Sequence, residues 1–139
     1  MRGRPVSAPL PPLTPDEAWV RARLAEHVRA LAGEIGERNM WRPEALEASA
    51  RYISATFRDL QYDVTTQSFR VWRRSVCNIA AEVRGRSSPD AIIVVGAHYD
   101  TVLGCPGAND NATGIAAMLE VARLVQQAHP ADGQKRGVR

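Results

Sequence analysis

An unbroken apolar run near the middle of the chain constrains the fold more than any other feature. Residues 91–97 read Ala-Ile-Ile-Val-Val-Gly-Ala, with no polar residue and no alternation. A strand that is exposed on one face alternates apolar and polar residues, whereas a strand covered on both faces of a mostly parallel sheet does not. The run therefore predicts a central strand over residues 91–97.

A loop rich in glycine and proline follows this run, and the next segment has helical periodicity. We expect a helix from about Asn111 to Ala128, with a buried face formed by Ile115, Met118, Leu119, Ala122 and Val125. Strand, loop and helix are two-thirds of a β–α–β unit, whose return strand should pair beside the first. After Pro130 we expect that strand to be missing, with residues 136–139 only the first turn into it. The domain is thus expected to be incomplete at its C-terminal end.

Two helices are predicted before the apolar run. Thr14 and Glu17 match a capping box, with Pro15 at the first helical position, and apolar residues recur every three or four positions from Val20 to Ile35. A second helix is predicted from Pro43 to about residue 60. Each of these helices should bury one face.

A β-hairpin is predicted after the second helix. Residues 64–71 and 76–84 are short, rich in β-branched residues and separated by residues 72–75. Residues 85–90 form a loop by composition. The fold class is therefore α/β: two N-terminal helices, a β-hairpin and the start of a mostly parallel sheet flanked by helices. Residues 1–13 are expected to be a flexible proline-rich leader, and residues 14–139 to belong to a single domain.

Composition excludes several classes of function. The 18 basic and 15 acidic residues are spread along the sequence, too dilutely to indicate nucleic-acid or membrane binding. No stretch approaches the length of a membrane span, and the N-terminus lacks the apolar core of a signal peptide. Cys77 and Cys105 form no disulfide framework and are expected to be free thiols in a reducing compartment. We expect a cytoplasmic protein, of an oligomeric state that the sequence does not indicate.

Three polar residues near the apolar run are candidates for a metal site. His98 lies just past the end of the run, where open α/β sheets place their ligand sites. A neutral imidazole is a good zinc ligand when its other nitrogen has an acceptor, and Asp100, at position i+2 of an extended segment, can provide it. Asp110 stands at the mouth of the next helix, where a carboxylate can bridge two cations. A lone His-x-Asp is a weak signal, and a surface histidine with no ligand remains an alternative for it.

Five other residues are given structural roles. We expect His27 to be a partly buried or exposed structural histidine and Glu120 to be an ordinary helix-surface or N-terminal-support charge. Cys105 is expected not to bind metal. Asn109 and Asn111 are expected to shape the loop around Asp110 through side-chain to backbone hydrogen bonds.

Residues 97–102 (AHYDTV) followed by residues 106–123 (PGANDNATGIAAMLEVAR) closely resemble metallopeptidase family twenty-eight. This family comprises the co-catalytic zinc aminopeptidases, including aminopeptidase S and aminopeptidase Y. Residues 31–39 (LAGEIGERN) and the helix around Tyr52 also look like the N-terminal portion of that family. The resemblance covers about residues 20–139 and is sharpest at residues 96–123.

The resemblance implies a role for each candidate residue. His98 would ligate one metal ion, Asp110 would bridge two, and Asp100 would orient His98. The implied cofactor is zinc, as two divalent ions in a complete family member. The family's general base and an adjacent ligand are two consecutive glutamates beyond the next strand, and no such pair follows Asp110 here. The implied reaction is aminopeptidase-type hydrolysis at peptide or protein N-termini, with no nucleic-acid or membrane partner.

Two alternatives stay open. One is a related zinc fold with another reaction, such as glutaminyl cyclase or an H-x-D carboxypeptidase or deacetylase. The other is a catalytically incomplete fragment that has no enzymatic function.

We predict that the chain of residues 1–139 alone, with zinc added, does not hydrolyse aminoacyl-nitroanilides. Its sequence offers His98 and Asp110 as ligands, which leave most of the roughly four coordination positions of each zinc to water. The glutamate that would accept the proton of the attacking water is also missing. The measurement compares this chain with a longer protein that continues through the next strands. Zinc-dependent turnover by the short chain that His98→Ala abolishes would contradict the prediction.

Overall fold

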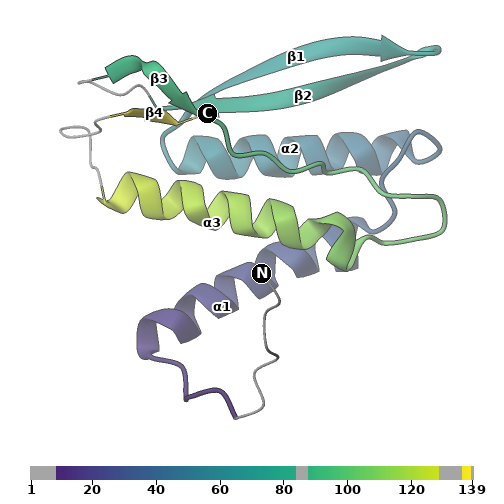
Figure 1. The fold of residues 1–139 in the computed structure, drawn as a ribbon. Coiled ribbons are helices and arrows are strands. Elements are labelled where there is room, and N and C mark those ends of the chain that lie inside the picture. Colours follow the sequence, from purple (N-terminus) through teal and green to yellow (C-terminus); the bar gives the residue numbers. More distant parts are fainter. Residues whose placement is uncertain (1–8, 84–87, 129–135, 139) are drawn as a thin grey trace, which may run out of the picture.

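The computed structural model describes residues 9–83, 88–128 and 136–138, and it confirms the expected α/β class (Figure 1). Along the chain the elements are α1 (Pro15–Val28), η1 (Arg29–Ile35), α2 (Pro43–Asp59), β1 (Asp63–Val71), β2 (Arg74–Glu82), β3 (Ser88–Ile93), η2 (Ala108–Ala112), α3 (Thr113–Ala128) and β4 (Arg136–Val138). The β1–β2 hairpin lies along one side of α2, α3 lies beside α2, and α1 packs against α3.

Local signals in the sequence set where the first two helices begin. Thr14 Oγ1 accepts a hydrogen bond from the backbone N of Glu17 at 3.3 Å, and Glu17 Oε2 accepts one from the backbone N of Thr14 at 2.8 Å. These are the two reciprocal bonds of a capping box, with Pro15 at the first helical position. Pro43 likewise begins α2. Both predicted helices are confirmed.

The predicted hairpin is confirmed with a shorter turn. Strand β1 pairs antiparallel with β2, and Val71 lies opposite Arg74, so the turn consists of Trp72 and Arg73 alone. Trp72 has a φ of 53°, the left-handed backbone that tight hairpin turns require. Arg84 and residues 85–87 of the expected loop lie outside the described residues.

The sheet beyond the hairpin differs from the expectation in two respects. Strand β3 includes residues 88–90, which were expected to be loop, and it ends at Ile93 rather than at Ala97. In addition, β4 pairs parallel with β3, with Ile93 opposite Val138. A short return strand is therefore present, and the expectation that it was missing is wrong for residues 136–138. Among the described residues β4 is the only partner of β3, so the hydrogen-bonded ladder stops where β4 stops.

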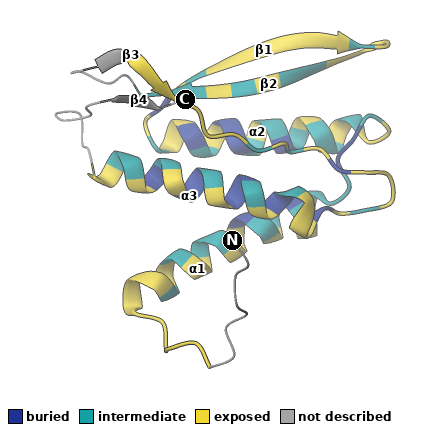
Figure 2. Cartoon of the chain, in the orientation of Figure 1, coloured by how far each residue is buried: buried dark blue, intermediate teal, exposed yellow. Residues whose placement is uncertain are grey.

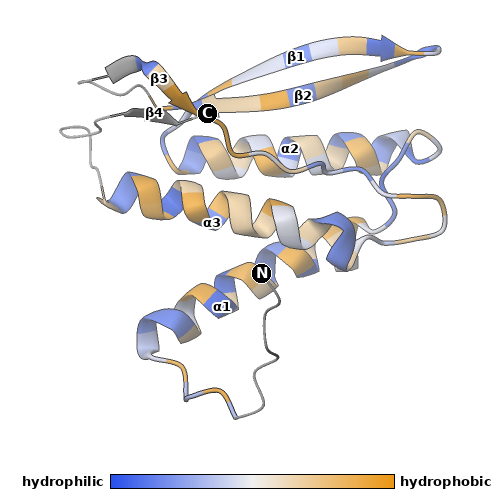
Figure 3. Cartoon of the chain, in the orientation of Figure 1, coloured by the Kyte–Doolittle hydropathy of each residue, from blue (hydrophilic) through white to orange (hydrophobic). Residues whose placement is uncertain are grey.

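The apolar run is not buried on both faces as expected. Ile93 is 47% exposed and Val94 is 75% exposed, and Figure 3 shows this hydrophobic stretch in orange along β3 and the segment after it. On one side, Val95 borders the same small cavity as Met118 and Ala122 of α3. The other side of the run has no covering layer within the described parts of the chain.

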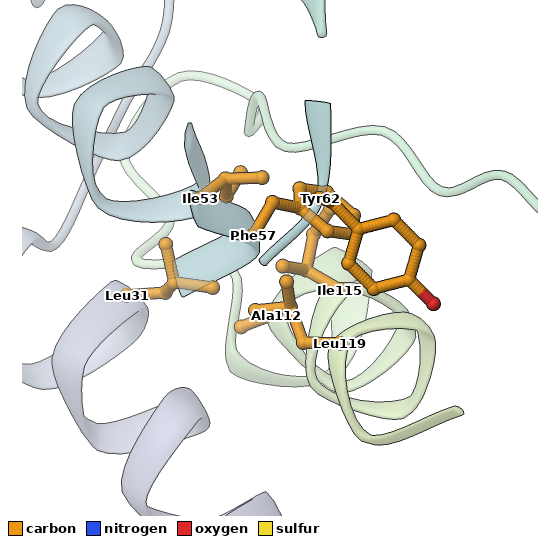
Figure 4. Packing of buried hydrophobic residues seen from close by; sticks show 7 residues of the cluster. All are labelled: Leu31, Ile53, Phe57, Tyr62, Ala112, Ile115 and Leu119. Carbon is orange, nitrogen blue, oxygen red and sulfur yellow. The ribbon is translucent and has the colours of Figure 1, made fainter. Parts of the chain in front are cut away.

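The hydrophobic core lies between η1, α2 and α3. It consists of Leu31, Ile53, Phe57, Tyr62, Ala112, Ile115 and Leu119 (Figure 4). Figure 2 shows the buried residues of α2 and α3 as dark blue bands along both helices. The predicted buried face of α3 is confirmed at Ile115 and Leu119, which are 1% and 0% exposed.

A buried charge cluster joins α1 to α3 and includes Glu120, so the first of the two expectations for Glu120, a helix-surface charge, is wrong. Glu120 is 2% exposed, and it accepts hydrogen bonds of 2.8 Å from Nε of both Arg23 and Arg123. The expectation failed because α1 crosses the side of α3 that carries Glu120. Burial alone would raise the pKa of Glu120, but the hydrogen bonds and charges of Arg123 and Arg23 outweigh it and lower that pKa.

His27 is buried, whereas we expected a partly buried or exposed structural histidine. It is 4% exposed, its Nδ1 lies 2.7 Å from the hydroxyl of Tyr52, and its Nε2 lies 3.5 Å from Oε1 of Glu120. Burial lowers the pKa of His27, while the nearby Glu120 acts in the opposite direction. His27 therefore belongs to the contact of α1 with α2 and α3.

Four further expectations concern the N-terminal leader, the domain boundaries, the cysteines and the absence of a membrane span. Residues 1–8 of the expected leader lie outside the described residues, and residues 9–13 are exposed and form no helix or strand. The single-domain boundaries stay a prediction. Cys77 and Cys105 are free thiols, as expected. In the part of the chain that the structure describes, no helix has the length and apolar character needed to span a bilayer.

We predict that Leu119→Ala lowers the free energy of unfolding by about 2–5 kcal/mol, since a fully buried leucine leaves a cavity when it is truncated. Leu124→Ala on the same helix is the matched control, because Leu124 is 45% exposed and its truncation should cost much less. Urea denaturation measures both. Equal losses for the two variants would show that α3 does not pack by this face.

We predict that the free energy of unfolding falls as the pH is lowered through and below 6.5, the ordinary pKa of histidine, partly because of His27. The pKa of His27 is lowered in the folded chain, so the unfolded chain binds this proton first and is favoured by acidification. In His27→Gln this contribution is absent, and the decrease in stability between about pH 7 and pH 5 should be smaller. Urea denaturation at both pH values tests this, and identical decreases would exclude His27 as a source.

Candidate metal centre

The segment that carries His98 is anchored to the hairpin by Tyr99. The Tyr99 hydroxyl donates a 2.7 Å hydrogen bond to the carbonyl oxygen of Cys77 in β2. Burial raises the pKa of Tyr99, and the contact of its hydroxyl with the Cys77 thiol, 3.6 Å away, acts in the same direction, so the hydroxyl stays a donor. This contact fixes the backbone between His98 and Asp100.

The structure brings the three predicted site residues together. His98 Nδ1 lies 3.1 Å from Oδ1 of Asp100, and His98 Nε2 lies 3.0 Å from Oδ1 of Asp110. The side chains of His98, Asp100 and Asp110 are 54%, 64% and 73% exposed, so the group is open to solvent. The geometry is the one that the sequence led us to expect, and the metal-binding and orienting roles stay predictions.

The arrangement of His98 and Asp110 fits a divalent metal such as zinc. When Nδ1 donates its proton to Asp100, the lone pair of Nε2 points toward Asp110. Two ligands placed about 2.0–2.1 Å from one tetrahedral zinc lie roughly 3.3 Å apart, close to the observed 3.0 Å. No group of three or more His, Cys, Asp or Glu side chains is placed to hold a metal within the described ranges. Asp100 faces the opposite ring nitrogen, so two side chains share the site.

The turn before α3 presents Asp110. The carboxamide Oδ1 of Asn111 accepts a 3.0 Å hydrogen bond from the backbone N of Gly114, and the Thr113 hydroxyl donates a 2.8 Å bond to the carbonyl oxygen of Asn109. Asn111 thus shapes the turn through its side chain, as predicted, whereas Asn109 contributes its backbone oxygen. Asp110 has φ −121° and ψ 92°, a backbone conformation outside the helix that begins after it.

Sequence reasoning gave no role to Arg38, whose side chain lies under the site loop and is 0% exposed. Its guanidinium donates hydrogen bonds of 2.6–3.1 Å to the carbonyl oxygens of Leu31, Gly36, Tyr99, Pro106 and Gly107. The segment containing Arg38 contributed to the family resemblance, but a single arginine between a glutamate and an asparagine carries no local signal of burial.

A cavity of about 500 Å³ opens beside His98 and Asp100. Aromatic side chains from two parts of the fold line it, namely Trp41 before α2 and Phe69 and Trp72 of the hairpin. The ring centroids of Trp41 and Trp72 are 6.1 Å apart. The candidate metal centre therefore borders an apolar hollow.

Comparison with known proteins identifies relatives for this segment. Residues 78–139 match the model of peptidase family M28. The chain is 34% identical over 130 residues to the uncharacterized protein YfbL of Escherichia coli K12, covering 88% of this chain and 39% of that protein. It is 42% identical over 72 residues to an aminopeptidase of Pseudomonas aeruginosa UCBPP-PA14, covering 52% and 13%. It is 36% identical over 64 residues to a probable zinc metalloprotease of Pyricularia oryzae 70-15, covering 40% and 13%.

Solved structures share the fold. The crystal structure of Fimbriiglobus ruber glutaminyl cyclase superposes with a TM-score of 0.66 at 26% identity, covering 98% of this chain and 47% of that one. The chain spans well under half the length of the curated relatives it matches. The residues around His98 and Asp110 lie inside residues 78–139, the segment that is similar to peptidase family M28.

Proposed function

We propose that this chain carries the first metal-binding part of an aminopeptidase-type metallopeptidase site. The observation that supports this best is the 3.0 Å approach of His98 Nε2 to Asp110 Oδ1, with Asp100 on the other ring nitrogen. The names of the relatives, an aminopeptidase and a probable zinc metalloprotease, point to the same chemistry. The proposed substrates are N-termini of peptides or proteins.

In this proposal His98 and Asp110 hold a divalent ion, with zinc favoured by the nitrogen and oxygen donor set. When bound, the ion supplies a Lewis acid that polarises a carbonyl and lowers the pKa of water. Asp100 accepts a hydrogen bond from Nδ1–H of His98, which fixes the ring tautomer with its lone pair on Nε2 and orients the ring. Asp110 adds a negative charge that favours a cation between the two side chains. We propose two ions, as the family resemblance implies.

A cytoplasmic location is part of the proposal. The free thiols of Cys77 and Cys105 are compatible with a reducing compartment.

The similarity to a glutaminyl cyclase over 98% of this chain supports a second candidate reaction. In a cyclising enzyme the same histidine and carboxylate would hold zinc. Assays with an aminoacyl-nitroanilide and with a glutaminyl-nitroanilide, made on the longer protein that continues through the next strands, distinguish the two. Release of nitroaniline without formation of pyroglutamate supports the peptidase.

We predict that the chain binds Zn²⁺ weakly, and that His98→Ala and Asp110→Asn each raise the dissociation constant by tenfold or more. Asp100→Asn should weaken binding by about tenfold to a hundredfold, as expected for a residue that orients a ligand. Asp59→Asn, on the exposed end of α2, is the matched control and should leave binding unchanged. Competition with a chromogenic chelator measures each constant. The same dissociation constant in wild type and His98→Ala would refute the proposed site.

A further inference from the structure

Arg38 makes an unusual set of contacts for a buried charge. Within the part of the chain that the structure describes, the Arg38 guanidinium forms no ion pair with a carboxylate, and its five hydrogen bonds go to backbone carbonyl oxygens. A buried cation needs its charge and its donors satisfied, since an unpaired buried group costs free energy. Burial lowers the pKa of Arg38, and the nearby carboxylate of Asp100 acts in the opposite direction. Arginine nevertheless stays charged in proteins.

The hydrogen bonds of Arg38 reach both ends of the loop between the two candidate ligands. Nε donates to the carbonyl oxygen of Tyr99 at 2.6 Å, next to His98 in the chain. Nη1 and Nη2 donate to the carbonyl oxygens of Pro106 and Gly107 at 2.6 and 3.1 Å, just before the turn that presents Asp110. One planar group therefore sets the separation of the two arms of the loop.

The backbone of Arg38 adds two bonds to the first arm. Its N donates to Oγ1 of Thr101 at 3.1 Å, and its carbonyl oxygen accepts from the N of Thr101 at 2.9 Å. The remaining guanidinium bonds, to Leu31 and Gly36 at 3.0 and 2.9 Å, tie this arrangement to the end of η1. Leu31 belongs to the hydrophobic core, so Arg38 connects the loop to the core by hydrogen bonds.

The second arm packs closely against the first. Gly107 has a φ of 63°, and a Cβ at this position would meet the methyl group of Thr101 and lie 2.6 Å from the carbonyl oxygen of Asp110. The carbonyl oxygen of Gly107 also accepts a 3.0 Å bond from the N of Ala112, the last residue of η2, just before α3. A displacement at Arg38 is thereby transmitted to the residues on both sides of Asp110.

We infer that Arg38 is a positioning residue for the candidate metal centre, holding His98 and Asp110 at ligand distance by bonding the two arms of their loop. The inference rests on the proposed function for the metal itself. Lysine cannot replace arginine here, because an ammonium offers three donors from one point while the guanidinium offers five in a fixed plane.

The test uses the chain of residues 1–139 with Arg38→Lys and Thr101→Val. The second variant removes one bond to Arg38 and leaves the buried guanidinium in place. Arg123→Lys is the matched control, because Arg123 is also a buried arginine but bonds Glu120, on the other side of α3. Three quantities are measured for each protein: the dissociation constant for Zn²⁺, the thermal midpoint, and amide hydrogen exchange at Thr101 and Ala112.

We expect Arg38→Lys to raise the Zn²⁺ dissociation constant about tenfold or more and to accelerate exchange at both amides, as a residue that orients ligands should. Thr101→Val should have the same effects to a smaller degree. Arg123→Lys should lower the thermal midpoint without changing the dissociation constant more than about twofold. This contrast separates positioning from a general loss of stability.

Two results would overturn the inference. One is unchanged zinc binding and exchange in folded Arg38→Lys, and the other is an equal loss of zinc binding in Arg123→Lys. If Arg38→Lys does not fold, zinc binding and amide exchange in Thr101→Val test the inference in the same way. Absence of His98-dependent zinc binding in the wild-type chain refutes the proposed function instead, and amide exchange in the variants then decides whether Arg38 holds the two arms.

Discussion

The hydrogen bonds from one buried guanidinium to five backbone carbonyl groups are the interaction on which the rest of the site depends. Residues 94–107 form no helix or strand, so their carbonyl oxygens lack the partners that regular structure supplies. A buried carbonyl left unpaired costs about 1–3 kcal/mol. The Arg38 guanidinium donates hydrogen bonds to the carbonyl oxygens of Tyr99, Pro106 and Gly107 at the same time. The irregular loop that carries His98 can therefore lie against the core.

Two buried charged groups in this fold are stabilised in opposite ways. Arg38 is surrounded by neutral carbonyl dipoles, whereas Glu120 is paired with the guanidinium groups of Arg23 and Arg123. The Arg123 guanidinium also lies 4.2 Å from the ring centroid of Trp19 on α1, a cation–π contact. The Glu120 cluster holds α1 on α3, and Arg38 holds the loop on η1. Between them, α3 and the loop are fixed to the same N-terminal helical segment.

Features that local sequence determines were predictable, and features that depend on distant contacts were not. The start of α1 follows from Thr14 and Glu17, which bond each other within one turn. The burial of Glu120 depends on α1, which lies almost a hundred residues earlier in the chain, and no local pattern around Glu120 indicates it. The predicted extent of β3 was wrong for the same reason. A strand needs a hydrogen-bonded neighbour, and β4 is short.

For the candidate site, the proximity of His98 and Asp110 was predictable because strand ends and helix starts meet at one edge of an α/β sheet. The contribution of Arg38 to the site was not predictable from the sequence. It joins residues more than sixty positions apart, and an arginine between glutamate and asparagine reads as a surface residue. Only the three-dimensional structure reveals that its partners are carbonyl oxygens from three separate segments.

The exposure of the site residues decides what holds them in place. His98 and Asp110 are 54% and 73% exposed, and an ion pair so open to solvent contributes about 0–1 kcal/mol. Such a contact is too weak to fix a loop of more than ten residues. The bonds beneath it are buried, and the loss of any one leaves a buried polar group unpaired, at a cost of about 1–3 kcal/mol. The 3.0 Å separation of His98 and Asp110 is therefore set by the buried framework around Arg38 rather than by the attraction between the two side chains.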